Sequence, residues 1–298
     1  MATLKTQMEA VKRLPTAEIL LVLVAIFWGT SYGVTKEALL VTSVLTFLAI
    51  RFSITFLMML PVLWRDLAAG RASGWPYAML TGLILLGVFL AESYGVKYTS
   101  ATNAAFLISL SVLLTPFIEW LVFRVFPGWR LCLWVLVFLI GAYLLVLNGN
   151  STLQLNLGDG LILVAAALRG VMVVATKKLI PNASISTLSL TAVQMGVVAM
   201  GALVMVFLVD TGLPKLQTLP SSFWWAIAYL VLFCTLFAFF AQNYGVRHTS
   251  PSRAALLMGT EPAFGGLFAV LWLGETLSNI QLVGAFLVVT AALAGARR

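Results

Sequence analysis

The sequence predicts an all-α membrane protein in which ten transmembrane helices form two inverted five-helix repeats around a central cavity. Three observations support this fold class. Apolar residues make up 61% of the 298 residues and charged residues only 9%, which is too little charge to solvate the surface of a soluble domain of this size. The apolar residues gather in ten long runs, and two stretches of the first half recur in the second.

Each apolar run is long enough to cross the bilayer, because about 30 Å of hydrocarbon takes roughly 20 helical residues. The runs are continuous and lack the alternation of membrane-barrel strands. Connections between them are short, so we expect no attached soluble domain. Residues 1–14 form either a short amphipathic surface helix or a disordered segment. The predicted helices are 17–36, 43–64, 76–96, 101–123, 130–148, 158–177, 184–209, 222–246, 252–273 and 278–296.

Two sequence matches relate the halves of the chain. YGVKYTSATNAAFL, beginning at Tyr94, returns 150 residues later as YGVRHTSPSRAALL, beginning at Tyr244, with 8 identical positions. ILLVLVAIFWGTSYGVTK (19–36) likewise aligns with GLILVAAALRGVMVVATK (160–177). Because five is odd, the second copy enters the membrane from the opposite side, as in inverted-repeat carriers whose site lies where the halves meet. The expected units are a cytoplasmic segment 1–16, a first repeat 17–148 and a second repeat 149–298.

The placement of positive charge predicts the orientation. If the amino terminus is inside, 13 of the 18 Lys and Arg residues fall on the inner side and 3 on the outer side. This bias follows the positive-inside rule and predicts a multi-pass protein of the cell inner (plasma) membrane with both termini in the cytoplasm. The net charge of +8 is then a topology signal that also favours anionic lipid, and nucleic-acid binding is not expected. The predicted outer cations are Lys36, Lys97 and Lys215.

The chain offers little for catalysis. Its one histidine, His248, allows neither an HExxH zinc motif nor a choice of Ser-His-Asp sets, and there is no GxxxxGK phosphate loop. Cys132 and Cys234 lie in apolar runs without disulfide or metal-ligand spacing. We therefore expect no catalytic residue, no metal and no cofactor.

Polar side chains inside the predicted helices are the candidate site, because ionisable groups at membrane depth are costly and face the bundle interior or a wet cavity. Burial favours a neutral carboxyl group, so Glu92 and Glu261 are the candidate proton-responsive groups. The alternative is structural ion pairing of Arg51 or Arg169 with either glutamate. The repeat alignment pairs Trp28 with Arg169, Arg51 with Gln194, Glu92 with Gln242, Ser93 with Asn243 and Tyr98 with His248, which would place both members around one central space.

Aromatic residues and glycines flank this set. Trp28 and Tyr32 lie four residues apart on one helical face, beside Gly29 and Gly33. Tight helix packing at the glycines would leave the aromatic pair beside the site. Ordinary packing or an interfacial position is the alternative for Tyr32 and Tyr94.

Bends are predicted in the fourth and ninth helices. Pro116 and Pro262 each remove a backbone hydrogen bond, and Gly259 precedes the second proline. Paired bends would serve as gate hinges, and static kinks are the alternative. Glu119 lies one turn from Arg124, so we expect these two to form an interfacial ion pair.

The pattern resembles the EamA-like branch of the drug/metabolite transporter superfamily over essentially the whole chain. The residues that carry the resemblance are FWGTSYGVTK at 27–36, Arg51, the joint at 94–107, and GTEPAFGGLFAVLWLGETLSNIQLVGAFLVV at 259–289. Within the branch it is most similar to the YddG-type bacterial inner-membrane exporters of amino acids. The resemblance implies a ten-helix exporter with a central cavity.

We therefore expect a secondary transporter that exports amino acids, neutral and aromatic with broad specificity, or related small metabolites, by alternating access. Its partners would be the small-molecule substrate and the lipid bilayer, with a monomer assumed. The alternatives are an exporter of other metabolites or drugs, a channel, and a membrane enzyme or lipid-handling protein. The expected substrate-binding residues are Trp28, Tyr32, Arg51, Glu92, Tyr94, Arg169, Gln194, Gln242, Asn243 and Glu261, and the expected hinges are Pro116, Gly259 and Pro262.

Overall fold

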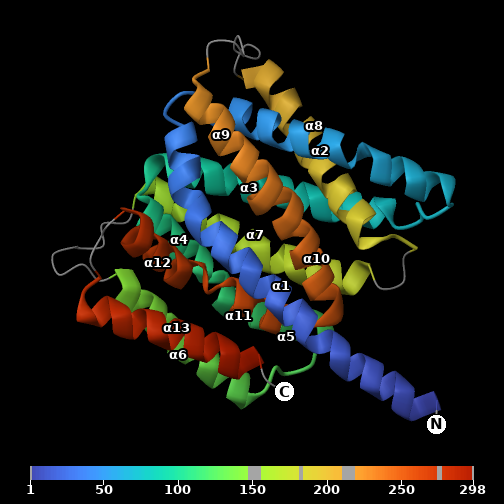
Figure 1. Cartoon of the computed structure of the whole chain (residues 1–298), viewed down its shortest axis with the longest axis vertical. Helices are drawn as coiled ribbons and strands as arrows, with labels where there is room; N and C mark the ends of the chain where they lie inside the picture. Colours follow the sequence, from blue (N-terminus) through green and yellow to red (C-terminus); the bar gives the residue numbers. More distant parts are fainter. Residues whose placement is uncertain (1, 147–155, 181–183, 210–218, 274–276, 297–298) are drawn as a thin grey trace.

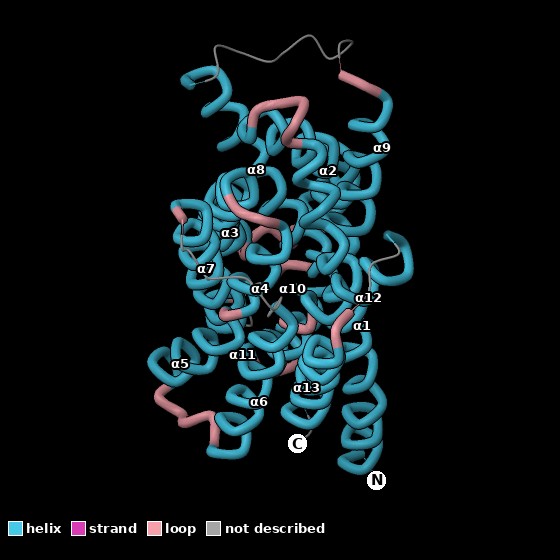
Figure 2. The backbone as a smooth tube through the Cα atoms, turned by 90° about the vertical axis from the view of Figure 1, so that its left-hand side faces the viewer, coloured by secondary structure: helices cyan, strands magenta, loops and turns pink. Residues whose placement is uncertain are grey.

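The structure is a computed structural model, described for residues 2–146, 156–180, 184–209, 219–273 and 277–296. Within these residues every regular element is a helix and there is no strand (Figure 2). Eight helical segments are long and apolar enough to cross a membrane, and Trp129–Leu145 is a shorter apolar helix. The all-helical membrane class predicted from composition is confirmed.

The helices follow the predicted apolar runs closely, and α1 extends back to Ala2. In the first half they are α1 (Ala2–Ala38), α2 (Val44–Ala68), α3 (Trp75–Tyr98), α4 (Ala101–Ser109), α5 (Ser111–Phe123) and α6 (Trp129–Val146). In the second half they are α7 (Leu157–Leu179), α8 (Thr187–Val209), α9 (Ser221–Tyr229), the π-helix η2 (Leu230–Phe237), α10 (Ala238–His248), α11 (Pro251–Met258), α12 (Glu261–Leu273) and α13 (Asn279–Ala296). Three predicted runs are thus divided into shorter helices: α4 with α5, α9 with η2 and α10, and α11 with α12.

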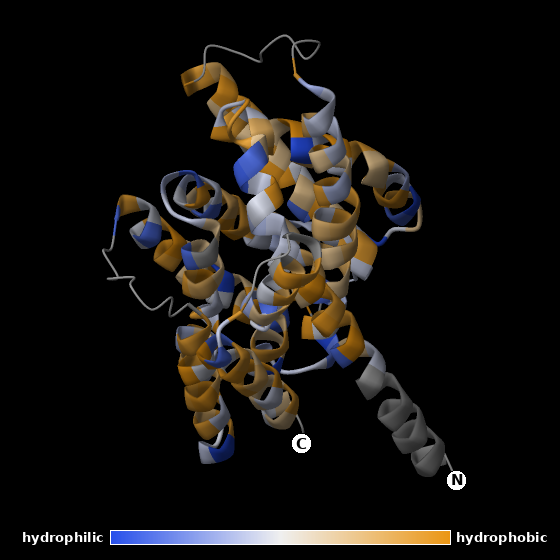
Figure 3. Ribbon diagram, turned by 60° about the vertical axis from the view of Figure 1, so that its left-hand side comes forward, coloured by the Kyte–Doolittle hydropathy of each residue, from blue (hydrophilic) through white to orange (hydrophobic). Residues whose placement is uncertain are grey.

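Hydrophobic residues predominate along the helices (Figure 3), and many large ones are exposed on the outside of the bundle. Leu208 is 79% exposed and Leu271 is 75% exposed, which a soluble protein would rarely tolerate on this scale. The buried core is mostly apolar as well, but it also contains polar groups, among them Arg51, Gln194 and Glu261. This distribution is expected where lipid is the solvent, because polar groups then need partners within the protein.

The two halves pack in a matched way. In Figure 1, α2 lies against α8 at one end of the molecule and α6 against α13 at the other. Helix α1 packs on α10 and α12, as α7 packs on α3 and α5. The aligned lysines also match: Lys36 Nζ donates to the carbonyl of Thr99 at 2.6 Å, and Lys177 Nζ donates to the carbonyl of Arg247 at 3.0 Å. Both termini lie at the lower end of the molecule in Figure 1.

Aligned helices are interrupted at aligned positions. Ser100 and Ser250 each cap the start of a short helix with their side chains. These helices are then interrupted at Leu110 and at residues 259–260. The break in the second half falls at Gly259 itself, so Pro262 is the second residue of α12 rather than a bend inside a helix, a position where its missing N–H costs nothing. Pro116 lies within α5, six residues beyond the break. Whether these residues act as hinges stays a prediction.

Gly29 brings two helices into backbone contact. A Cβ atom at this position would lie 2.6 Å from the carbonyl oxygen of Glu261 and 2.9 Å from the amide nitrogen of Gly265. Only glycine therefore lets α1 approach α12 this closely. A Cβ atom at Gly33, one turn along, would have no other atom within 4 Å. The predicted tight packing occurs at the first glycine alone, and it fixes α1 beside the start of α12.

Candidate functional site

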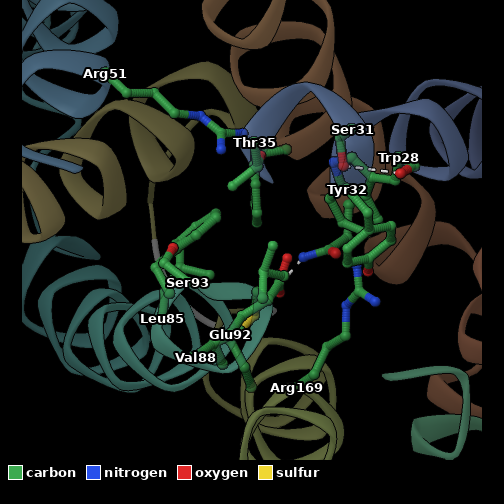
Figure 4. Close-up of a pocket in the computed structure, with 15 residues that line it drawn as sticks. Trp28, Ser31, Tyr32, Thr35, Arg51, Leu85, Val88, Glu92, Ser93 and Arg169 are labelled. Carbon is green, nitrogen blue, oxygen red and sulfur yellow. Dashed lines mark hydrogen bonds between the residues drawn. The ribbon is translucent and has the colours of Figure 1, made fainter. Parts of the chain in front are cut away.

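A narrow cavity lies within the bundle, between α1, α2, α3, α7 and α10. The volume open to the centre of a water molecule is about 20 Å³, which is room for about one water. Figure 4 shows Arg51 and Arg169 reaching it from opposite sides. Its lining consists of Trp28, Ser31, Tyr32, Thr35, Arg51, Leu85, Val88, Phe89, Glu92, Ser93, Val96, Arg169, Met172, Phe239 and Gln242.

Arg169 is the most constrained charge at the site. Its Nη1 lies 3.0 Å from Glu261 Oε1 in a buried ion pair, and its guanidinium carbon lies 4.2 Å from the centre of the Trp28 ring. Tyr32 donates its hydroxyl proton to Glu261 Oε2 at 2.9 Å. Glu261 is the first residue of α12, where the helix dipole favours a negative charge. Because Trp28 and Arg169 are aligned in the repeat, their contact places the cavity where the halves meet.

Arg51 is held on the opposite side by η2. Its Nε donates to Thr235 Oγ1 at 2.8 Å, and that hydroxyl donates to the carbonyl of Leu230 at 2.7 Å. The adjacent carbonyl of Cys234 accepts the Trp28 indole proton at 2.8 Å. One π-helical stretch therefore orients a cation and an aromatic ring of the site. Such stretches are rare and occur frequently at functional sites.

Two polar groups of the cavity have unused bonding capacity. Glu92 forms no hydrogen bond or ion pair with any residue that the structure describes, although Arg169 and Arg51 are close enough to influence it electrostatically. The Gln242 carboxamide is 1% exposed. Its nitrogen contacts only the Met172 sulfur, at 3.8 Å, and its oxygen has no partner. A buried amide without a good partner is costly unless a ligand or water completes it.

The site thus balances its charges, with two arginines facing two glutamates. The ion pairing that the sequence left as an alternative is present for Arg169 and Glu261, and Arg51 is instead held by a hydroxyl and by aromatic rings. A site of this kind can bind both a positively and a negatively charged group of one small ligand.

Six of the predicted binding residues line the cavity, and Glu261 adjoins it through Arg169 and Tyr32. The structure does not bring Gln194, Asn243 or Tyr94 to the cavity wall. Asn243 donates to Gln194 Oε1 at 2.7 Å and to Thr191 Oγ1 at 3.0 Å, and Gln194 donates to Thr81 Oγ1 at 2.9 Å. This network joins α8, α10 and α3. Tyr94 packs against the larger apolar core.

Ser31, Thr35 and Thr235 were not predicted from the sequence as residues of the site. Hydroxyl residues are common in membrane helices and carry no distinct signal. Ser31 lies one helical turn after Phe27, and Thr35 lies one turn after Tyr32. Both are on the helical face that begins at Trp28, so their positions could have been predicted. Thr235 could not, since its role depends on the π-helical register of η2.

Comparison with known proteins gives a consistent result. The sequence model of the EamA-like transporter family matches residues 15–147 and again residues 156–294. An uncharacterized transporter of Archaeoglobus fulgidus is 31% identical over 96% of this chain and 87% of its own length. The uncharacterized transporter YyaM of Bacillus subtilis is 24% identical over 92% of each chain. A crystal structure of a protein with 17% identity superposes with a TM-score of 0.74, covering 94% of this chain and 96% of that one.

Proposed function

Since the chain belongs to the EamA-like transporter family and has two such repeats in a multi-pass membrane protein, we propose that it is a secondary transporter that exports amino acids by alternating access. The proposed substrates are neutral and aromatic amino acids or similar zwitterions, as for the YddG-type exporters. The observation that carries this proposal is the charge-balanced cavity around Arg169, to which both halves of the chain contribute lining residues.

For the architecture, we propose ten spans in two inverted five-helix halves, with both termini in the cytoplasm of the inner membrane. The domain boundaries are those of the repeats, 17–148 and 149–298. Support comes from the matched packing, the aligned interruptions and the lysine contacts, together with the charge bias. Single cysteines placed beside Lys97 and Arg247 should react from opposite sides of the membrane. Reaction from the same side would contradict the inversion.

For the substrate, each group of an amino acid has a counterpart in the cavity. Arg169 presents a forked donor to the carboxylate. The Gln242 oxygen and the Glu92 carboxylate, which lack partners in this state, suit the ammonium group. Trp28 and Tyr32 provide ring faces for the side chain. A phosphorylated sugar would require clustered cations, and here the cations are matched by carboxylates.

For the mechanism, we propose that the substrate carboxylate displaces Glu261 from Arg169. In the present state the cavity has room for about one water, so an amino acid enters only after the helices around it separate. The ion pair and the Tyr32 hydroxyl tie α7 and α1 to the start of α12. Exchanging the internal carboxylate for that of the substrate would release α12 and couple binding to opening.

Glu92 is the preferred candidate for proton coupling, because it faces the cavity without a partner while Glu261 is engaged in an ion pair. If Glu92→Gln changes neither the rate of transport nor its pH dependence, coupling through this residue is wrong.

The experiment that tests the function is counterflow in proteoliposomes. Unlabelled amino acid inside should drive saturable accumulation of the labelled compound, as expected for a carrier. Arg169→Ala and Trp28→Ala should lose this flux while remaining monodisperse in chromatography. Arg65→Ala, an exposed arginine remote from the cavity, is the matched control and should retain it. Flux that is linear in concentration would indicate a channel. If a substrate screen finds flux only for solutes without an ammonium group, the second candidate applies, an exporter of other metabolites or drugs.

A further inference from the structure

A second and much larger hollow is lined by residues of α5, α6, α11 and α13 and of the connection between α5 and α6. These helices lie toward the lower end of Figure 2. The volume of the hollow is about 500 Å³, measured in the same way as that of the site cavity. An amino acid would fit within it. The lining includes aromatic side chains and two arginines, and its most informative members are Glu119, Phe126, Arg130, Trp134, Ser252 and Arg253.

A small cavity of about 10 Å³ has lining residues close in sequence to those of this hollow and shares one with the site. Thr115 and Ala255 line it. Thr115 is one helical turn from Glu119 on α5, and Ala255 is one turn from Ser252 on α11. Arg169 lines both the small cavity and the site cavity. The residues that line the three hollows therefore follow one another along α5 and α11 and lead to Arg169 of the proposed substrate site.

Between the residues that line the large hollow and those that line the small one, α5 of the first half contacts α11 of the second half. Glu119 Oε2, on α5, accepts the backbone N–H of Ser252 at 2.8 Å and also the Ser252 hydroxyl proton. Ser252 lies in the first turn of α11, where the backbone N–H groups have no partner within the helix and the dipole favours an anion. The predicted pairing of Glu119 with Arg124 is wrong, because the carboxylate caps α11 instead.

The electrostatics of the large hollow favour anionic groups. Arg130 and Arg253 have no acidic partner among the residues that the structure describes. The charge of Glu119 is directed at the end of α11. A solute carboxylate in the hollow would therefore meet uncompensated positive charge.

We propose that the large hollow is the access vestibule of the transport site and that the Glu119–Ser252 contact is the latch that closes it. The vestibule takes carboxylate-bearing solutes, attracted by Arg130 and Arg253, and opening the latch connects it through the small cavity to Arg169. This proposal rests on the proposed transport function. It also explains why Glu119 is bonded across the repeat interface instead of to the arginine in its own half.

The test uses a cysteine at Ala255, which is 4% exposed and lies behind the latch. In a Cys132→Ser, Cys234→Ala background, the Ala255→Cys thiol should react slowly with an anionic methanethiosulfonate reagent. Glu119→Gln and Ser252→Ala should each accelerate the reaction about tenfold or more, because a hydrogen bond to a charged group is lost. Ser252→Thr keeps the hydroxyl and should stay slow. An Ala69→Cys thiol, exposed just beyond the end of α2, should react at the same rate in every background.

A second arm tests the arginines. In the Glu119→Gln background, Arg130→Ala with Arg253→Ala should lower the rate for the anionic reagent relative to a cationic one by several-fold, and added salt should reduce the difference. Arg65→Ala should leave the ratio unchanged. Equal reactivity of Ala255→Cys with and without the latch, or no reaction in the latch variants, would overturn the proposal. Because labelling needs no substrate, it can succeed even if amino-acid transport is disproved.

Discussion

Removing the charge of Glu261 should destabilise the protein and at the same time strengthen binding of a carboxylate ligand. The carboxylate lies 3.0 Å from the Arg169 guanidinium, with side-chain exposures of 1% and 10% for the two partners. Breaking a buried pair by removing one partner costs about 3–5 kcal/mol, since the other charge stays buried without compensation. Glutamine keeps the shape and can still bond to Tyr32, and Glu92 remains nearby. The lower end of the range, about 3 kcal/mol, is therefore expected for Glu261→Gln.

A carboxylate ligand should then replace the missing charge. A hydrogen bond to a charged group contributes about 1.5–3 kcal/mol, so the affinity of the variant for an amino acid should exceed that of the wild type by about 10- to 100-fold. Thermal unfolding in detergent, with and without amino acid, measures both effects. Glu261→Gln should unfold at a lower temperature without ligand and show a larger ligand-induced rise.

Glu92→Gln is the matched control, because it removes a carboxylate charge from the same cavity without breaking an ion pair. Its stability should change by no more than about 1 kcal/mol. The reasoning fails if Glu261→Gln is as stable as the wild type, or if its ligand-induced rise equals that of the wild type.

Two further substitutions test how the site is positioned. Gly29→Val places a Cβ 2.6 Å from the Glu261 carbonyl oxygen and should abolish monodisperse protein or lower its unfolding temperature sharply. Gly33→Val, whose Cβ would have nothing within 4 Å, should be tolerated. Equal effects of the two substitutions would refute the close approach of α1 and α12. Thr235→Val leaves the buried Arg51 Nε without its acceptor and should cost about 1–3 kcal/mol in thermal unfolding, and an unchanged unfolding temperature would mean that the π-helix does not hold Arg51.

The fold class and the contents of the cavity could largely be predicted from the sequence. Apolar runs report membrane helices directly, because lipid leaves no alternative way to satisfy the backbone. The repeat alignment helped to locate the cavity, since the aligned residues Trp28 and Arg169 are in contact there. Ionisable residues at membrane depth were also informative, because they are costly there unless they face the bundle interior or a wet cavity.

Partnerships between side chains could not be predicted in the same way. Gln194 and Asn243 are polar and buried like Gln242, yet they hydrogen-bond to each other between helices while Gln242 faces the cavity. The difference arises from helix rotation and the approach of α8 to α3, which no local pattern encodes. Glu119 likewise lies one turn from Arg124, but a helix end from the other half competes for its carboxylate. In both cases the hydrogen-bond partner is set by contacts between helices that are far apart in the sequence.

The measurement that tests the central claim most directly compares an amino acid with its amide as inhibitors of counterflow, in wild-type and Arg169→Ala proteoliposomes. A charged hydrogen bond to the carboxylate should let the wild type prefer the free acid by about tenfold or more. Any residual inhibition of the Arg169→Ala protein should not distinguish the two compounds. A preference for the acid that survives unchanged in the variant, or no preference in the wild type, would contradict a site built around Arg169.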